Sequence, residues 1–244
     1  SPIGIGAGTT DVSLLTTLTA FTARNSSGTS AAGTESNPTG SAMYAYKAVP
    51  TVSQVALPNS SLAGGTMTIA KFTVSSGGTG TIAWKQVMFE ISKAAAPTLA
   101  SPTLWNADTG EQITAAVAFQ NGTSGVASTC VADNTFCELL ITRGTNADDD
   151  TVESVSGAKT YEVRATIGGT LASGNFVSVT LDRNTTSHSA SAAFQTNKNS
   201  GAAGNVSFTW SDESGSATGD TGMATWQKDY LVKNTPISWT LNRS

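Results

Sequence analysis

The sequence is poor in the side chains that most enzymes use for chemistry. Its 244 residues include one histidine, two cysteines and only 12% charged residues. A nucleophile–histidine–carboxylate site would have to use His188, but no Gly-x-Ser-x-Gly turn precedes a helical segment, and Asp182 is the acidic residue nearest to it. No glycine-rich phosphate-binding loop is present. We therefore expect a protein that is not an enzyme and has no cofactor.

Positive charge is scarce, and long apolar runs are absent. The chain has thirteen Lys and Arg residues and seventeen Asp and Glu residues, which gives a net charge of −4. A nucleic-acid binder needs a surplus of Lys and Arg to displace counterions from phosphates. A membrane-spanning helix needs about 18 or more consecutive apolar residues. We therefore expect neither a nucleic-acid partner nor a membrane span.

What the chain does contain is Ala, Gly, Ser, Thr and Val arranged in short strand-like runs. Residues 66–74 alternate between apolar and polar side chains, with a bulge expected between Ile69 and Phe72. Residues 82–91 place Val87, Phe89 and Ile91 on one face. Turn residues recur about every 8–12 positions, which is typical of a β-sandwich.

The expected fold class is all-β, an immunoglobulin-like β-sandwich with additional strands and an extended N-terminal arm. The arm takes residues 1–24, and a linker with a first strand takes residues 25–48. The sandwich itself takes residues 49–183. Residues 184–244 supply C-terminal strands that pack on it.

The two cysteines, Cys130 and Cys137, lie close together in the sequence. The intervening Ala-Asp-Asn is turn-forming, so the cysteines are expected to face each other across a hairpin as a disulfide. Two free thiols and a metal site are the alternatives, although two cysteines cannot complete a tetrahedral zinc site. A disulfide implies an oxidising compartment. A start at Ser-Pro-Ile, without Met, is typical of a processed secreted protein, so we expect an extracellular or cell-surface location.

Six Asn-x-Ser/Thr triplets agree with that location as candidate glycosylation sites. A chain so rich in Asn, Ser and Thr also produces such triplets by chance. The asparagines are Asn25, Asn59, Asn121, Asn184, Asn205 and Asn242.

Two further groups of side chains suggest ligands. Asp148, Asp149 and Asp150 are a weak calcium candidate, because Ca²⁺ takes several hard oxygen ligands. Their spacing lacks EF-hand regularity, so a solvated acidic loop is the alternative. The five tryptophans suit either a sugar-binding face or the core of a sandwich.

The C-terminal segment carries the most distinctive phrase of the sequence. Phe208-Thr-Trp-Ser-Asp-Glu-Ser214 is followed by Trp226-Gln-Lys-Asp-Tyr-Leu-Val-Lys-Asn-Thr-Pro236. This ending resembles that of uncharacterised secreted, Ig-like surface proteins from candidate-phyla-radiation bacteria. The resemblance implies a secreted β-sandwich surface protein and brings no activity or functional residues.

The N-terminal arm gives the sharpest functional hypothesis. Apolar residues at alternate positions can pair with the protein's own sheet or add as a strand to a neighbouring subunit. Repeated head-to-tail addition of this kind builds a filament. The residues expected at the subunit contact are Ile3, Ile5, Val12, Leu14 and Leu18.

The sequence therefore predicts a structural subunit of an extracellular polymer, either a pilus-like filament or a surface layer. Its partners would be copies of itself, with surface glycans as a second class of partner. A carbohydrate-binding or adhesin module is the alternative function. A secreted hydrolase is the third, because paired carboxylates can lie far apart in a sequence.

Overall fold

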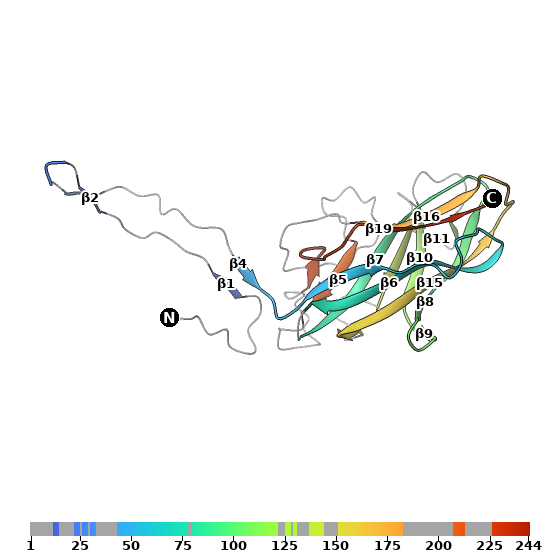
Figure 1. Ribbon diagram of the computed structural model, residues 1–244, viewed down its shortest axis with the longest axis horizontal. Coiled ribbons are helices and arrows are strands. Elements are labelled where there is room, and N and C mark those ends of the chain that lie inside the picture. The colour runs from blue at the N-terminus through green and yellow to red at the C-terminus, as the bar shows by residue number, and fades with distance from the viewer. Residues whose placement is uncertain are drawn as a thin grey trace.

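A computed structural model gives an all-β architecture (Figure 1). Apart from two isolated parallel bridges, its strand pairings are antiparallel, and no helix occurs within the residues that it describes. This confirms the expected fold class. The described residues are 12–14, 22–24, 26–28, 30–32, 43–77, 80–121, 125–127, 129–130, 137–143, 151–182, 207–212 and 226–244.

The sandwich consists of two sheets. The six-stranded sheet has the order β12-β8-β15-β6-β5, with β9 paired to β8. Its strands are β5 (Val49–Gln54), β6 (Gly65–Gly77), β8 (Thr98–Asn106), β9 (Glu111–Ile113), β12 (Thr129–Cys130) and β15 (Ala158–Gly168).

The nine-stranded sheet has the order β11-β10-β13-β7-β16-β19, with β14 and β17 also paired to β7, and β18 to β17. Its strands are β7 (Thr81–Lys93), β10 (Ala116–Asn121), β11 (Gly125–Ala127), β13 (Cys137–Thr142), β14 (Glu153–Ser156), β16 (Phe176–Leu181), β17 (Phe208–Ser211), β18 (Gln227–Lys228) and β19 (Ile237–Asn242).

This strand order is that of an immunoglobulin fold. The run β8-β15-β6-β5 corresponds to strands D-E-B-A, and β7, β16 and β19 correspond to C, F and G. The strands β9 to β14 are inserted between D and E. The inserted β13 pairs with the edge of β7 that lies opposite β16.

Strand β7 organises the larger sheet. One of its edges pairs with β13 and then β14, and the other with β16 and then β17. As expected, Val87, Phe89 and Ile91 are buried in the core. The structure adds that every residue from Ile82 to Phe89 is buried, including Lys85, so this strand is covered on both faces.

The bulge predicted in residues 66–74 is present in β6. Val163 pairs with Ala70 and the next residue, Arg164, pairs with Thr68, so Ile69 is the extra residue. Ile69 and Ala70 are consequently both buried, and alternation resumes with Phe72.

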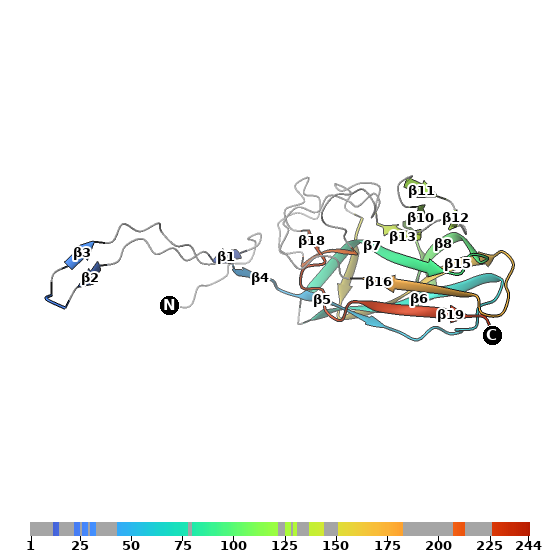
Figure 2. The same cartoon turned by 90° about the horizontal axis from the view of Figure 1, so that it is seen from above.

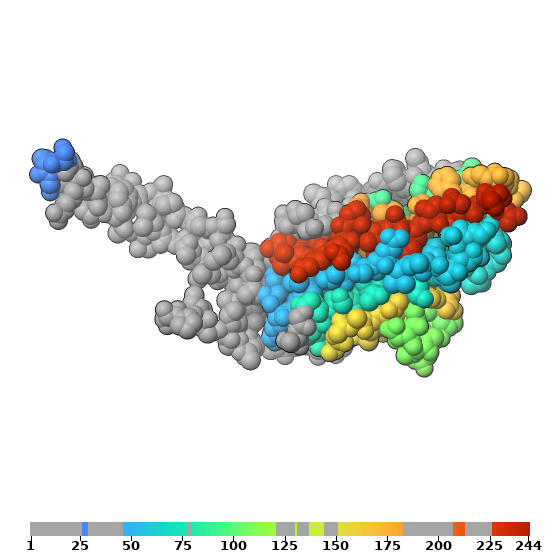
Figure 3. Space-filling model, in the orientation of Figure 1, coloured from blue at the N-terminus to red at the C-terminus, as the bar shows by residue number. Residues whose placement is uncertain are grey.

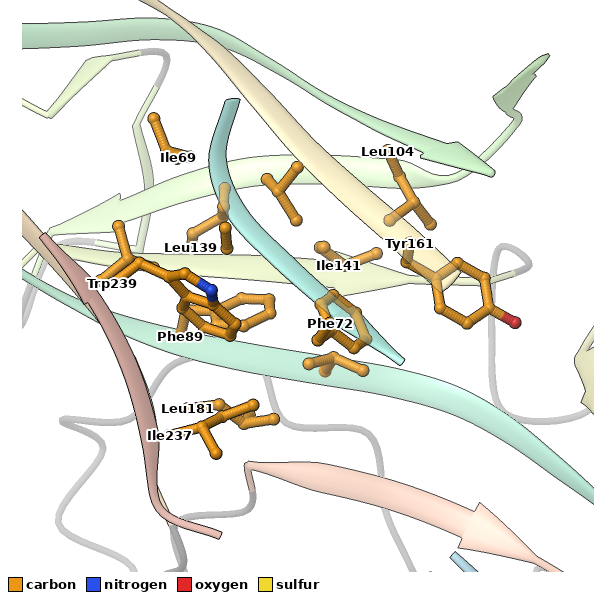
Figure 4. Close-up of a cluster of buried hydrophobic side chains, with 14 of the residues drawn as sticks. Ile69, Phe72, Phe89, Leu104, Leu139, Ile141, Tyr161, Leu181, Ile237 and Trp239 are labelled. Carbon is orange, nitrogen blue, oxygen red and sulfur yellow. The ribbon is translucent and has the colours of Figure 1, made fainter. Parts of the chain in front are cut away.

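Aromatic rings fill the space between the sheets (Figure 4). The ring of Phe72 lies 5.6 Å from that of Phe89 and 5.4 Å from that of Tyr161. The Tyr161 hydroxyl donates to Glu153 Oε2 at 3.3 Å, and Glu153 also forms an ion pair of 3.0 Å with Arg143. Burial and the Glu153 carboxylate raise the pKa of the Tyr161 hydroxyl. This polar contact joins the two sheets, because Glu153 belongs to β14 and Tyr161 to β15.

One side of the sandwich is closed by contacts between β5 and the C-terminal segment. The Val52 amide donates to the Lys233 carbonyl at 3.1 Å, and the Lys233 amide donates to the Pro50 carbonyl at 3.0 Å. Farther along, the Trp239 indole donates to the Val55 carbonyl at 2.8 Å. The edges of β5 and β19 are therefore joined to each other.

The predicted disulfide between Cys130 and Cys137 is present, and both cysteines are buried. Its position differs from expectation. Cys130 ends β12 in the six-stranded sheet, whereas Cys137 begins β13 in the nine-stranded sheet. The bond therefore connects the two layers and does not join two strands of one hairpin.

The N-terminal segment forms four short strands beyond one end of the sandwich (Figure 2). They are β1 (Val12–Leu14), β2 (Thr22–Arg24), β3 (Ser30–Ala32) and β4 (Met43–Ala45). Strand β1 pairs with β4, and β2 pairs with β3. The stretch 25–48, expected as a linker with one strand, thus contributes two strands that pair back with the arm. Gly28, at a φ of 82°, supplies the left-handed residue that the tight loop between β2 and β3 needs.

Candidate functional site: an N-terminal ribbon and its anchor

The four strands β1 to β4, here called the N-terminal ribbon, form two two-stranded sheets of their own. No described strand of the sandwich pairs with them. A two-stranded hairpin is marginally stable in water by itself and gains stability from a third strand or a packed face. Its outer edges also present main-chain donors and acceptors to any neighbouring chain. The ribbon is therefore an element suited to pairing with another molecule.

The ribbon lies beyond the end of the sandwich at which β5 begins, and β2 is its most distant labelled strand in Figure 1. The space-filling view shows residues 26–28, at the tip, far from the coloured body (Figure 3). Since β4 leads directly into β5, residues 46–48 connect the ribbon to the sandwich.

These connecting residues are held by an anchor cluster, consisting of Tyr46, Lys47, Trp210, Asp212 and Tyr230. The ring of Tyr46 lies 5.3 Å from that of Trp210 and 6.1 Å from that of Tyr230. The Lys47 amide donates to Asp212 Oδ2 at 2.8 Å. Asp212 and Trp210 are buried. The base of the ribbon is thus packed and hydrogen-bonded to the sandwich.

Hydrogen bonds within the C-terminal segment hold Trp210 and Tyr230 of this cluster in place. The Trp210 indole donates to the Tyr230 carbonyl at 2.9 Å. The buried Asp229 carboxylate accepts hydrogen bonds from the Ser207 amide at 3.0 Å and the Phe208 amide at 2.5 Å. Asp229 and Leu231 have φ values of 54° and 60°, which turn the chain sharply around Tyr230.

The distinctive C-terminal phrase therefore contributes to the attachment of the ribbon. Sequence reasoning left the roles of Trp210 and Trp226 open and did not connect this phrase with Tyr46. Lys47 and Asp212 are 165 positions apart, and no local pattern links residues at that separation. The available signal was Asp212 itself, a carboxylate that directly follows the strand-like residues Phe208–Ser211.

Of the predicted contact residues, Val12 and Leu14 lie in β1. They occupy alternate positions of that strand, with Ser13 between them. Ile3, Ile5 and Leu18 lie outside the described residues. Because β1 pairs with β4 of the same chain, the element available to a neighbour is a two-stranded ribbon and not a single free strand.

Two of the candidate glycosylation asparagines, Asn59 and Asn242, are exposed. The Asn59 side chain accepts a hydrogen bond from the Ser61 amide at 2.9 Å, and Ser61 forms a bridge with Asn242, so both asparagines lie in one region. Asn121 ends β10. Asn25, Asn184 and Asn205 lie outside the described residues.

The remaining chemical candidates from the sequence lie outside the described part of the chain. These are His188 and the acidic run Asp148, Asp149 and Asp150. Among the described residues, no group of three or more His, Cys, Asp or Glu side chains is arranged to hold a metal ion.

The tryptophans divide into two groups. Trp84, Trp210 and Trp239 are buried in the core. Trp226 and Trp105 are half-buried, and each ring carries a cation on one face: Lys85 Nζ lies 5.1 Å from the Trp226 ring, and the Arg164 guanidinium lies 4.2 Å from that of Trp105.

Arg164 belongs to a charged row on the outer face of the six-stranded sheet. Glu162 accepts hydrogen bonds from Lys71 Nζ at 2.8 Å and from Arg164 Nη2 at 2.8 Å. Partial burial acts to raise the pKa of the Glu162 carboxyl. The hydrogen bonds and charges of Lys71 and Arg164 outweigh this effect, so the pKa lies below its ordinary value.

A pocket of about 180 Å³ opens at the edge of the sandwich between β8, β9 and β10. No titratable side chain contributes to its lining. The lining residues are Pro102, Thr103, Leu104, Gln112, Ile113, Thr114, Ala115 and Val117.

The described residues include no helix long and apolar enough to cross a membrane. Comparison of the chain with protein-family models, with curated proteins and with solved structures finds no match.

Proposed function

We propose that this protein is a structural subunit of an extracellular polymer, pilus-like or layer-like, in which the N-terminal ribbon of one copy adds to a sheet edge of the next. The observation that carries the proposal is the ribbon itself. It is a two-stranded element outside the sandwich, with outer edges that no other described strand pairs and with an anchored base.

The energetics of the ribbon favour this use. Its strands are three residues long and belong to no larger described sheet, so a third strand from a neighbour would pair with main-chain groups that no described strand pairs. The anchor cluster reduces the freedom of the ribbon before assembly, which lowers the entropic cost of docking. An interlayer disulfide and a closed β5–β19 side suit a part that must resist mechanical load.

The other two functions have less support among the described residues. A sugar-binding platform needs open aromatic faces, whereas three tryptophans are buried and the other two carry a cation on one face. A hydrolase needs two carboxylates converging in a cleft, and the pocket between β8, β9 and β10 is lined by none.

Assembly can be tested with substitutions in β1. The double variant Val12→Asp, Leu14→Asp places two charges in that strand. We expect the wild-type chain to sediment as large species at high concentration and the double variant to remain a monomer. Sedimentation velocity over a hundredfold range of concentration measures this difference.

The matched control is Ser13→Asp, which adds a charge at the position between the other two. Because the sandwich core starts at Ala48, neither variant should change the unfolding transition of the sandwich. Deletion of residues 1–21 is the coarser version of the same test. Unaltered assembly after this deletion, with an intact monomer, would falsify the proposal.

A further inference from the structure

A row of oxygen-bearing side chains crosses the nine-stranded sheet. In the strand register, Gln120 of β10 is opposite Glu138 of β13, and Glu138 is opposite Glu90 of β7. Glu90 is in turn opposite Thr180 of β16, which is opposite Ser238 of β19. The alternate residues of these strands lie in the core, so the five side chains share the outer face of the sheet.

Burial decreases along this row from β10 to β19. Gln120 is 2% exposed and Glu138 is 3% exposed. Glu90 and Thr180 are half-buried, and Ser238 is exposed. The two carboxylates are therefore shielded on the side of β10, whereas a small ion can reach them from the side of Glu90.

Glu138 and Glu90 are direct cross-strand neighbours of the same charge. Opposite residues of an antiparallel pair have Cβ atoms about 4.5–5.5 Å apart, and like charges at such positions destabilise the sheet. A divalent cation between the two carboxylates would turn this repulsion into attraction. The described residues of the two flanking rows on the same face include no Lys or Arg. They are Ala118, Leu140 and Met88 on one side, and Ser92 and Ser178 on the other.

A third oxygen of the row is an independent sign of a ligand. Gln120 Oε1 is buried and has no hydrogen-bond partner among the described residues. Leaving a buried acceptor unpaired costs free energy. Because Gln120 is directly opposite Glu138, its amide lies beside the more deeply buried of the two carboxylates. An amide oxygen next to a carboxylate pair is a donor set for a hard cation.

We infer that Gln120, Glu138 and Glu90 form a calcium-binding site on the outer face of the nine-stranded sheet. Ca²⁺ takes oxygen ligands from carboxylates, amide carbonyls and water at about 2.3–2.6 Å. Two oxygens on one ion therefore lie up to about 5 Å apart, a separation that neighbouring strands provide. Glu138 lies between the other two residues and can share one ion with both.

The site goes beyond the proposed function. One ion would cross-link β10, β13 and β7 and so stiffen the sandwich, whether or not the chain assembles. Zn²⁺ suits the row less well, because the row contains no Cys or His. The site is also separate from the acidic run at residues 148–150.

Thermal unfolding of the dilute, full-length chain tests the site, first in EDTA and then with calcium added. With three side-chain ligands we expect a Kd of about 0.1–1 mM, as in extracellular calcium modules. A ligand that binds only the folded state raises Tm, so CaCl₂ at about 10 mM should raise it by about 3–10 °C. Sodium chloride at the same ionic strength should not produce this rise.

Two variants each remove one ligand, Glu90→Gln and Gln120→Met. We expect each to weaken calcium binding on the order of tenfold or more, which reduces the rise in Tm to about half or less. Gln120→Met keeps the size of the side chain and removes the unpaired oxygen, so its Tm in EDTA should not fall. Glu111→Gln, at an exposed position of β9, is the matched control and should keep the full rise.

A wild-type Tm that calcium raises no more than sodium does would overturn the site. The full rise in either Glu90→Gln or Gln120→Met would overturn it as well. If the triple variant Asp148→Asn, Asp149→Asn, Asp150→Asn loses the rise while those two keep it, the acidic run binds the ion instead. None of these outcomes depends on polymer formation, so the proposed function stands or falls separately.

Discussion

Asp229 is buried, has a left-handed backbone and uses its carboxylate to accept hydrogen bonds from two consecutive amides. Each of these properties restricts the residue types that fit there. An alanine would leave the Ser207 and Phe208 amides buried without an acceptor and would adopt positive φ at a steric cost. An asparagine keeps one oxygen acceptor and tolerates positive φ.

We therefore expect Asp229→Ala to lower the free energy of unfolding by about 3 kcal/mol, and Asp229→Asn to lower it by about 1 kcal/mol. Guanidinium denaturation followed by tryptophan fluorescence measures both values. Equal losses in the two variants would show that the carboxylate and its amide partners do not determine the stability of this turn.

Glu162 gives the fold a pH dependence of known sign. The pKa of its carboxyl is lower in the folded state than the ordinary value of 4.5, so its ionised form stabilises the fold above that pH. The stabilisation is lost as the pH falls through the folded-state pKa, which lies below 4.5.

Replacing Glu162 with Gln should cost about 1 kcal/mol at pH 7, the upper range for a partly exposed ion pair. The difference between variant and wild type should shrink as the pH falls below 4.5, because the wild-type carboxyl then becomes protonated. Urea denaturation at a series of pH values measures the difference. The exposed Glu111→Gln is the control, and a Glu162 effect that persists unchanged at low pH would contradict the assignment.

At the scale of the elements, the disulfide between β12 and β13 is a connection between layers. It closes a short loop, and even a short closed loop reduces the conformational entropy of the unfolded chain. The edge at which it lies lacks the β5–β19 contacts that join the layers on the other side.

Substitution of both cysteines by alanine should lower the free energy of unfolding by about 2–3 kcal/mol, as expected for a loop of about eight residues. Guanidinium denaturation of the variant, beside wild type with and without reductant, measures this. The reduced wild type should resemble the variant. An oxidised wild type no more stable than the variant would mean that the bond does not hold the layers together.

The sequence predicted those elements whose information is local. Alternation predicted the core-facing residues of β7 and the bulge of β6, because a period of two fixes which side chains share a face. The cysteine spacing predicted the bond between Cys130 and Cys137.

Other features depend on pairings between distant segments and were not predictable in the same way. The cysteines lie in different layers because β12 pairs with β8 and β13 pairs with β7. The burial of β7 on both faces, including Lys85, was not predicted, because the sequence indicated only that Val87, Phe89 and Ile91 share a face. The anchor cluster joins Tyr46 to the C-terminal segment, and no short pattern contains both.

At the scale of the whole molecule, the described chain is an immunoglobulin-like sandwich with an anchored ribbon at one end (Figure 1). A ribbon that projects from one copy and adds to a sheet edge of the next gives a heterologous contact, which propagates unless a rotation closes it into a ring. The function proposed here follows from main-chain edges and packing, and requires no reactive side chain.

Electron microscopy of the concentrated, full-length protein in negative stain tests this claim most directly. The account predicts linear particles whose repeat is close to the length of one sandwich, and which are absent from the Val12→Asp, Leu14→Asp variant under the same conditions. Dispersed single particles at every concentration of the wild type, or polymers that the variant forms equally well, would contradict it.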